Sequence, residues 1–177
     1  MQLRKLILQE HSKKQTMKIV NFIGTNQKRF DELIALCLGA DMVFAQRASW
    51  VYRYCVESGP MLKEKQISRI LKRIWKVSHS AVRRNFIKSL EYISIPESLE
   101  APVISLCFEL INSRDEFVAI KVYAMYYLFS CCLKYPDLKP ELKSSIETQL
   151  EFERPAFLSA SKKILKKFKS IKSISAN

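Results

Sequence analysis

Residues 41–47 read DMVFAQR, and two similar stretches follow at equal intervals, SHSAVRR at 78–84 and DEFVAIK at 115–121. Each begins with Asp or Ser, which can cap a helix, and carries a basic residue six positions later. The basic positions are 37 residues apart in both intervals. A weaker fourth copy places Lys162 in the basic position, 41 residues further on, and lacks the capping residue. A recurring period of this length is typical of stacked helical repeats.

Helix signals run from one end of the chain to the other, and turn residues are scarce. The 177 residues include three glycines and six prolines, too few for the many tight turns of a β-sandwich or barrel. The apolar periodicity predicts about nine helices and no strand, and therefore an all-α fold. The expected helices cover residues 12–23, 26–38, 41–57, 61–77, 79–93, 96–112, 115–134, 138–152 and 155–171.

Two of these helices combine an apolar side with a cationic one. In each, four apolar side chains share one side of the helix and four cations lie opposite, at about 100° per residue. In residues 61–77 the cations are Lys65, Arg69, Lys72 and Lys76. In the last helix they are Lys162, Lys163, Lys166 and Lys169. For the first helix a solvated outer face is the simpler interpretation, and salt-sensitive contact with a polyanion is the alternative. For the last helix a solvated outer face and binding to anionic lipid as a basic amphipathic helix explain the pattern equally well.

The segment 117–133 is apolar on nearly every side of the predicted helix. Val122 and Met125 share one side, while Ile120 and Leu128 lie on others. A helix of this kind needs neighbours on several sides, so we expect it to be the most buried one in the fold. Val122→Glu should then be among the most damaging single changes, because it buries an unpaired carboxylate.

The net charge of +13 is unevenly distributed along the chain. Residues 1–29 carry seven basic and one acidic residue, residues 61–92 nine and two, and residues 161–177 six and none. The remainder of the chain carries eight basic and 14 acidic residues. Such a charge favours polyanions, acidic proteins or anionic lipid as partners. If the three segments meet in the fold, they form one basic patch.

The cysteines and the N-terminus favour a cytoplasmic protein. The five cysteines are odd in number, show no C-x-x-C spacing and lie inside apolar runs, where reduced thiols act as small core side chains. They are Cys37, Cys55, Cys107, Cys131 and Cys132. The N-terminus lacks the continuous apolar stretch of a signal peptide, and no run approaches the length of a membrane span.

An Asp at the turn between paired helices, with Arg or Lys six positions later, resembles the HEAT and HEAT-like repeats, which stack into an α-α superhelix of the HEAT or ARM type. The resemblance covers about residues 26–171 as four helical pairs, after a capping helix at about 12–23. It implies a single helical-repeat domain over residues 1–177 that ends in a short C-terminal tail. It also implies that helices beginning near Asp41, Ser78, Asp115 and Pro155 form the inner, concave layer.

The repeated polar positions have two interpretations, structural and functional. We favour an inter-repeat ladder in which Arg47, Arg84 and Lys121 contact Asp41, Asp115 and backbone carbonyls. Arg53, Lys88 and Lys163 have no role in such a ladder and are expected to be free. The candidate binding surface comprises Arg53, Arg84, Lys88 and Lys163. Trp50 and Trp75 are expected to pack at the core or its rim rather than to stack on nucleic-acid bases.

No catalytic motif stands out in the sequence, and no cofactor or metal is expected. There is no phosphate-binding glycine loop and no nucleophile elbow, and two histidines, His11 and His79, are too few for a His-based metal cluster. Within the HEAT-like class, the basic DNA alkylation-repair proteins are a distant similarity, without their recognisable catalytic set. The first hypothesis is therefore a non-enzymatic interaction module that binds an acidic protein segment. The alternative is a nucleic-acid-binding protein without glycosylase activity.

Overall fold

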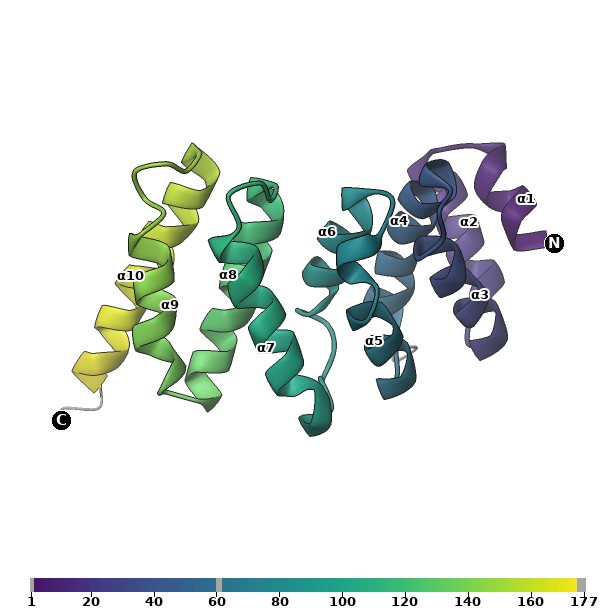
Figure 1. The fold of residues 1–177 in the computed structure, drawn as a ribbon. Coiled ribbons are helices and arrows are strands. Elements are labelled where there is room, and N and C mark those ends of the chain that lie inside the picture. The colour runs from purple at the N-terminus through teal and green to yellow at the C-terminus, as the bar shows by residue number, and fades with distance from the viewer. Residues whose placement is uncertain (1, 60–61, 175–177) are drawn as a thin grey trace. The chain divides into compact units, whose positions relative to one another are not determined.

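The computed structural model describes residues 2–59 and 62–174, with side chains up to residue 170. Every regular element in these ranges is helical, comprising ten α-helices and one 3₁₀-helix (Figure 1). This confirms the predicted all-α class. Within the same ranges, no helix is long and apolar enough to cross a membrane.

The chain divides into two compact units, Met1–Ala101 and Pro102–Asn177. Unit 1 contains six helices and the 3₁₀-helix η1 (Ile74–Lys76), followed by the start of α7 (Glu97–Asn112). Its helices are α1 (Gln2–Gln9), α2 (Lys13–Ile23), α3 (Gln27–Cys37), α4 (Met42–Ser58), α5 (Glu64–Leu71) and α6 (Ser80–Ser89). Unit 2 contains the rest of α7 and three further helices. These are α8 (Val118–Lys134), α9 (Leu138–Glu147) and α10 (Pro155–Ile174).

In unit 1, helices two apart in the chain pack side by side, as stacked hairpins require. The longest helix, α4, packs against α2 and α6 as well as against its hairpin partner α3, and α3 in turn contacts α5 (Figure 1). In unit 2, α8 packs against α9 and α10. The side-chain amide of Asn112, at the end of α7, donates to the Ser145 hydroxyl on α9 at 3.4 Å. Which layer is concave stays a prediction.

Short polar residues begin several helices by accepting hydrogen bonds from free backbone amides. The Ser12 hydroxyl accepts from the Gln15 amide at 3.1 Å, and Asp41 accepts from Val43 and Phe44 at 2.9 and 3.1 Å. The second copy of the repeat differs from expectation, because His79 and not Ser78 caps α6, through Nδ1. His79 is half-buried in this role.

Two elements differ from the sequence prediction. A helix at residues 2–9 was not predicted, and it forms because Leu3 and Ile7, one turn apart, are both buried. The predicted helix at 61–77 is instead α5 followed by the single turn η1. The α-helical hydrogen bonding of α5 ends near Lys72, and the Arg73 backbone amide donates to the Ile70 carbonyl, three residues back. Neighbouring cations repel one another along this stretch, which disfavours a longer helix.

The expectation that the helix at 115–134 is the most buried was wrong. In α4 eight residues are buried, whereas α8 buries six. Val122 is half-buried, and Ala124 and Met125 occupy the fully buried side instead. The α4 helix buries more because four other helices of unit 1 pack around it.

Candidate interaction surface

Hydrogen bonds between successive hairpins of unit 1 recur near the predicted spacing. The Tyr52 and Ser89 hydroxyls are 2.8 Å apart and 37 positions apart in sequence. The Asn85 amide donates to the Ser49 hydroxyl at 2.9 Å across 36 positions. These side chains are buried, and each has a partner, so they form a satisfied polar network between α4 and α6. The repeat period therefore corresponds to physical contacts between hairpins.

The first repeat's candidate ladder residues act on backbone groups. Arg47 donates from one guanidinium nitrogen to the carbonyl oxygens of Ile7 and Leu8, both at 3.2 Å. These carbonyls belong to the last turn of α1, which lacks intrahelical partners for them. Asp41 caps its own helix. The contact made by Arg47 thus links α4 to α1 through backbone carbonyls and not through Asp41.

In the third repeat, the basic residue is buried in an ion pair. Lys121 is 1% exposed, and its ammonium contacts the Glu153 carboxylate in the turn before α10. Asp115 lies exposed in the turn before α8, and Phe117 is the N-cap residue of that helix. The sequence prediction placed Lys121 in a ladder with Asp115, and the structure gives it Glu153 instead.

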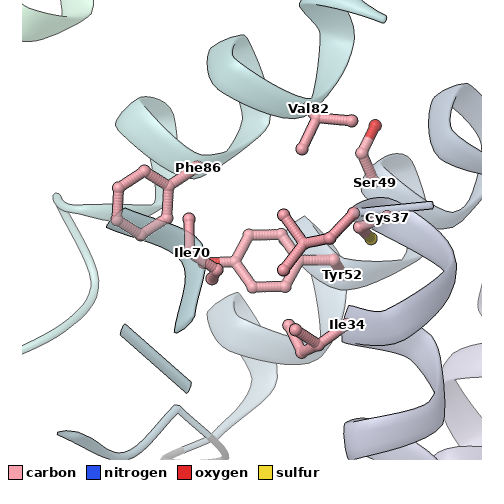
Figure 2. A pocket seen from close by; sticks show the side chains of 8 residues that line it. Ile34, Cys37, Ser49, Tyr52, Ile70, Val82 and Phe86 are labelled. Atoms are coloured by element: carbon pink, nitrogen blue, oxygen red, sulfur yellow. The ribbon is translucent and has the colours of Figure 1, made fainter. Parts of the chain in front are cut away.

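A small cavity lies inside unit 1, between α3, α4, α5 and α6. Figure 2 shows the Tyr52 ring among Ile34, Ile70 and Phe86, with Ser49 nearby. The cavity has a volume of about 10 Å³, which is space for one water molecule and not for a ligand. Burial raises the pKa of the Tyr52 hydroxyl above its ordinary range, and its bond to Ser89 opposes that shift. This site is part of the core.

Two wider clefts are open to solvent. One, of about 380 Å³ in unit 2, is lined by Arg114, Lys121, Thr148, Gln149, Phe152 and Glu153. The other, of about 410 Å³ in unit 1, lies between the C-terminal ends of α2 and α4. No group of three or more metal-ligating side chains occurs in the described part of the chain.

The buried thiols are poorly suited to nucleophilic chemistry. Burial raises the pKa of Cys55 to about 12 and that of Cys132 to about 11. It also raises the pKa of Cys37 and of Cys107 above the ordinary range. Because the thiolate is the reactive form, these four side chains act as core residues at neutral pH. None of the five cysteines, all of which lie in the described residues, forms a disulfide.

Two of the four predicted binding cations pair with carboxylates that are close to them in sequence. Arg53 donates from Nε to Glu57 at 2.7 Å, and the Lys88 ammonium lies 2.7 Å from a Glu91 oxygen. The expectation that both cations are free was therefore wrong. Arg84 and Lys163 are exposed, on α6 and α10 respectively. The helical spacings of the two pairs, four and three residues, were a visible signal that the sequence analysis missed.

A second set of cations is exposed and without carboxylate partners. Within residues 2–59 and 62–170, none of them forms an ion pair. We call this set the α5–η1 basic surface, and it comprises Lys65, Arg69, Lys72, Arg73 and Lys76. The nearby Glu64 carboxylate accepts a hydrogen bond from the Ser98 hydroxyl at 2.7 Å. Four of the exposed lysines of α10 form a comparable set in unit 2, the α10 lysine face. They are Lys162, Lys163, Lys166 and Lys169.

The two tryptophans differ in environment. Trp50 is half-buried and packs edge-on against His11, with ring centroids 5.2 Å apart. Trp75, in η1, is 47% exposed, and the Arg83 guanidinium lies 5.9 Å from its ring centroid. Trp75 therefore adds an exposed apolar ring to η1, where its sequence neighbour Lys76 belongs to the α5–η1 basic surface.

A second carboxylate, that of Asp31, also lies near this surface. The Asp31 carboxylate on α3 accepts from the Gln66 amide at 2.7 Å and from the Gln27 amide at 3.2 Å. The Gln66 bond is the main cause that lowers the pKa of Asp31, and the charges of Lys65 and Arg69 add to it, while burial opposes them. Asp31 is thus held by neutral amides and makes no salt bridge to the surrounding cations.

The basic segments of unit 1 lie on neighbouring helices. The segment 1–29 contains α1, α2 and the start of α3, and α3 contacts α5, which carries part of the second basic segment. That these segments form one basic patch stays a prediction.

The family model of a HEAT repeat domain matches residues 3–168. Together with the all-helical structure, this match confirms the predicted α-α solenoid fold class. It gives no support to the more specific similarity to DNA alkylation-repair proteins. Neither a curated protein nor a solved structure matches the chain.

Proposed function

Because the chain belongs to the HEAT repeat domain family, we propose that it is a non-enzymatic helical-repeat module that binds an acidic segment of a partner protein. Stacked helical repeats present extended surfaces that suit protein binding, and the non-enzymatic part of the proposal rests on this family character. The cytoplasmic location stays a prediction.

The observation that carries the proposal is the division of the cations into paired and unpaired sets. Arg53, Lys88 and Lys121 have carboxylate partners within the fold. The α5–η1 basic surface has none in the part of the chain that the structure describes. An acidic partner supplies the missing carboxylates, and the resulting potential accelerates its association.

The direct test is a binding measurement with a labelled peptide of about ten residues that is rich in Asp and Glu. A control peptide of the same length carries Asn and Gln in their place. Fluorescence anisotropy at about 50 mM salt should show binding of the acidic peptide alone, and about 200 mM salt should weaken it. Equal binding of both peptides, or of neither, would contradict the proposal.

Nucleic acid is the second candidate, and the net charge of +13 supports it. Phosphate contacts release counterions, so affinity for short duplex or single-stranded DNA should fall by orders of magnitude between about 50 and 200 mM salt. Charge reversal at Arg53, Arg84 and Lys88, compared with reversal at Lys65, Arg69 and Lys72, would locate such a surface. No detectable binding at 50 mM salt would eliminate this candidate.

A further inference from the structure

We propose that the α5–η1 basic surface, together with the exposed ring of Trp75 in η1, is the docking site for a short acidic segment that also carries an apolar side chain. This inference rests on the proposed function and assigns it to named residues. The partner segment places Asp or Glu against the cations and the apolar side chain against the indole ring.

The charges of this surface favour an external anion. Five cations lie between residues 65 and 76, and no carboxylate of the described chain forms a salt bridge with any of them. Like charges one helical turn apart, such as Lys65 and Arg69, repel each other, and a bound carboxylate removes that repulsion. Arg69 and Arg73 add planar guanidinium groups that can bind a carboxylate through two parallel hydrogen bonds.

Trp75 supplies the apolar part of the site. Its ring is 47% exposed and lies in η1 between Arg73 and Lys76 in sequence. The Arg83 guanidinium, 5.9 Å from the ring centroid, helps to hold the indole in place. Partly exposed aromatic rings surrounded by arginine are enriched at protein-binding surfaces. The combination of arginine and lysine side chains with an exposed indole ring distinguishes this surface from the α10 lysine face, which is defined by lysines alone.

The opposite side of the element is fixed in the core. Ile67, Ile70 and Ile74 are at most 3% exposed and anchor both α5 and η1. The Gln66 amide is bonded to Asp31, and Glu64 is bonded to Ser98. The backbone that carries the cations is therefore held before any partner binds, which reduces the entropy lost on binding.

Two observations favour an acidic peptide over a membrane surface or a nucleic acid as the partner. A bilayer surface needs an apolar helix face to insert, and the apolar face of α5 is already in the core. Single-stranded nucleic acid is bound through successive aromatic rings, and Trp75 is the one exposed aromatic ring among residues 62–76.

The experiment compares two charge-reversal variants with matched changes in net charge. Lys72→Glu/Arg73→Glu alters the α5–η1 basic surface, and Lys162→Glu/Lys166→Glu alters the α10 lysine face. All four side chains are exposed, and none forms an ion pair in the described part of the chain. Thermal melts followed by circular dichroism check that both variants remain folded. Binding is measured by anisotropy with an acidic peptide that contains one Phe, and with a single-stranded oligonucleotide.

We expect the first variant to bind the peptide at least tenfold more weakly and the second to change the affinity less than threefold. Equal losses, or a larger loss from the second variant, would overturn the inference and leave the proposed function standing. Tighter binding of the oligonucleotide, lost in the first variant, would replace the peptide by a nucleic acid. No binding of the peptide to the unmodified protein would contradict the proposed function itself.

A fluorescence measurement tests the role of Trp75 separately. The chain has two tryptophans, so Trp50→Phe leaves Trp75 as the sole indole reporter. Saturation with the Phe-containing peptide should shift the emission of Trp75 to shorter wavelength, because the partner's apolar side chain excludes water from the ring. A peptide with Ala in place of Phe should bind more weakly and shift the emission less. Unchanged emission at saturation would show that the acidic segment binds elsewhere.

Discussion

The seam between α4 and α6 in unit 1 and the seam between α8 and α10 in unit 2 join successive hairpins with different chemistry. The first is closed by neutral hydrogen bonds, Tyr52 with Ser89 and Asn85 with Ser49. In the second, the Ser161 hydroxyl lies 3.9 Å from the Met125 sulfur, which is a weak acceptor. The strong polar contact there is the ion pair of Lys121 and Glu153, where the turn from α9 leads into α10.

The difference shows that the repeat specifies where hairpins touch but not how the contact is made. The basic position of the repeat has three distinct environments. Arg47 donates to backbone carbonyls, Arg84 is exposed, and Lys121 is buried against a carboxylate. Removing one partner should destabilise the charged seam more than the neutral one. A buried charge without a counterion costs much more free energy than a buried hydroxyl without a hydrogen-bond partner. Substitutions at the two seams can measure that difference.

The largest effect should follow from Glu153→Gln. This change leaves the Lys121 ammonium buried without a counterion, since Lys121 is 1% exposed. Removing one partner of a buried ion pair costs about 3–5 kcal/mol in the free energy of unfolding. Urea titration followed by circular dichroism measures the loss.

Lys121→Met is the matched control for that change. It removes the charge and keeps most of the side-chain volume, so its cost should be clearly smaller than that of Glu153→Gln. Lys121→Met should also rescue much of the stability of Glu153→Gln when the two changes are combined. Equal costs for the two single variants would mean that the ion pair behaves like an exposed one, and the contrast between the two seams would fail.

A smaller effect should follow from Tyr52→Phe at the neutral seam. The ring stays in place, and the loss of one buried hydrogen bond to Ser89 should cost about 1 kcal/mol. The Ser89 hydroxyl keeps its bond to the Phe86 carbonyl, which limits the penalty.

A double-mutant cycle with Ser89→Ala isolates the contribution of the Tyr52–Ser89 hydrogen bond. Its coupling energy should be well below that of the Lys121–Glu153 pair, measured with the same titration. A coupling energy as large as that of the ion pair would erase the distinction between neutral and charged seams.

Much of this fold could be predicted because helical periodicity is a local property of the sequence. The spacing of 37 residues anticipated contacts such as Tyr52 with Ser89, which lie one period apart. The helix at 2–9 was missed because its eight residues offer two buried apolar positions between charged ones. His79 and Ser78 are adjacent and both can cap a helix, so the sequence did not decide between them.

The candidate site was less predictable, because pairing of charges depends on three-dimensional neighbours. Arg53 and Glu57 are four residues apart, and their pairing could have been read from the sequence. Glu153 lies in a turn 32 positions from Lys121, and only the packing of unit 2 brings it to the lysine. The same holds for the absence of partners at the α5–η1 basic surface, which depends on where the surrounding carboxylates lie in the described part of the chain.

The smallest effect concerns Asp31, a charge held by amides rather than by a counterion. Its pKa is lowered below 3.8, chiefly by the Gln66 hydrogen bond. A carboxylate with a depressed folded pKa contributes stability that is fully present above its unfolded pKa. That contribution is lost as the pH falls through the folded pKa. The pH window for this contribution therefore lies below about 4.

Asp31→Asn removes this titration while keeping an oxygen that can accept from Gln66. At pH 7 the variant should be slightly less stable than the unmodified protein, because Lys65 and Arg69 lose a nearby negative charge. As the pH falls below about 4 the two urea midpoints should converge, since the unmodified protein loses the Asp31 contribution as the carboxylate is protonated. If the urea midpoints of the two proteins change in parallel with pH, the amide hydrogen bonds stabilise the protonated and the ionised forms of Asp31 equally. Asp31 and the Lys121–Glu153 pair would then differ in their contribution to stability only because the pair is more deeply buried.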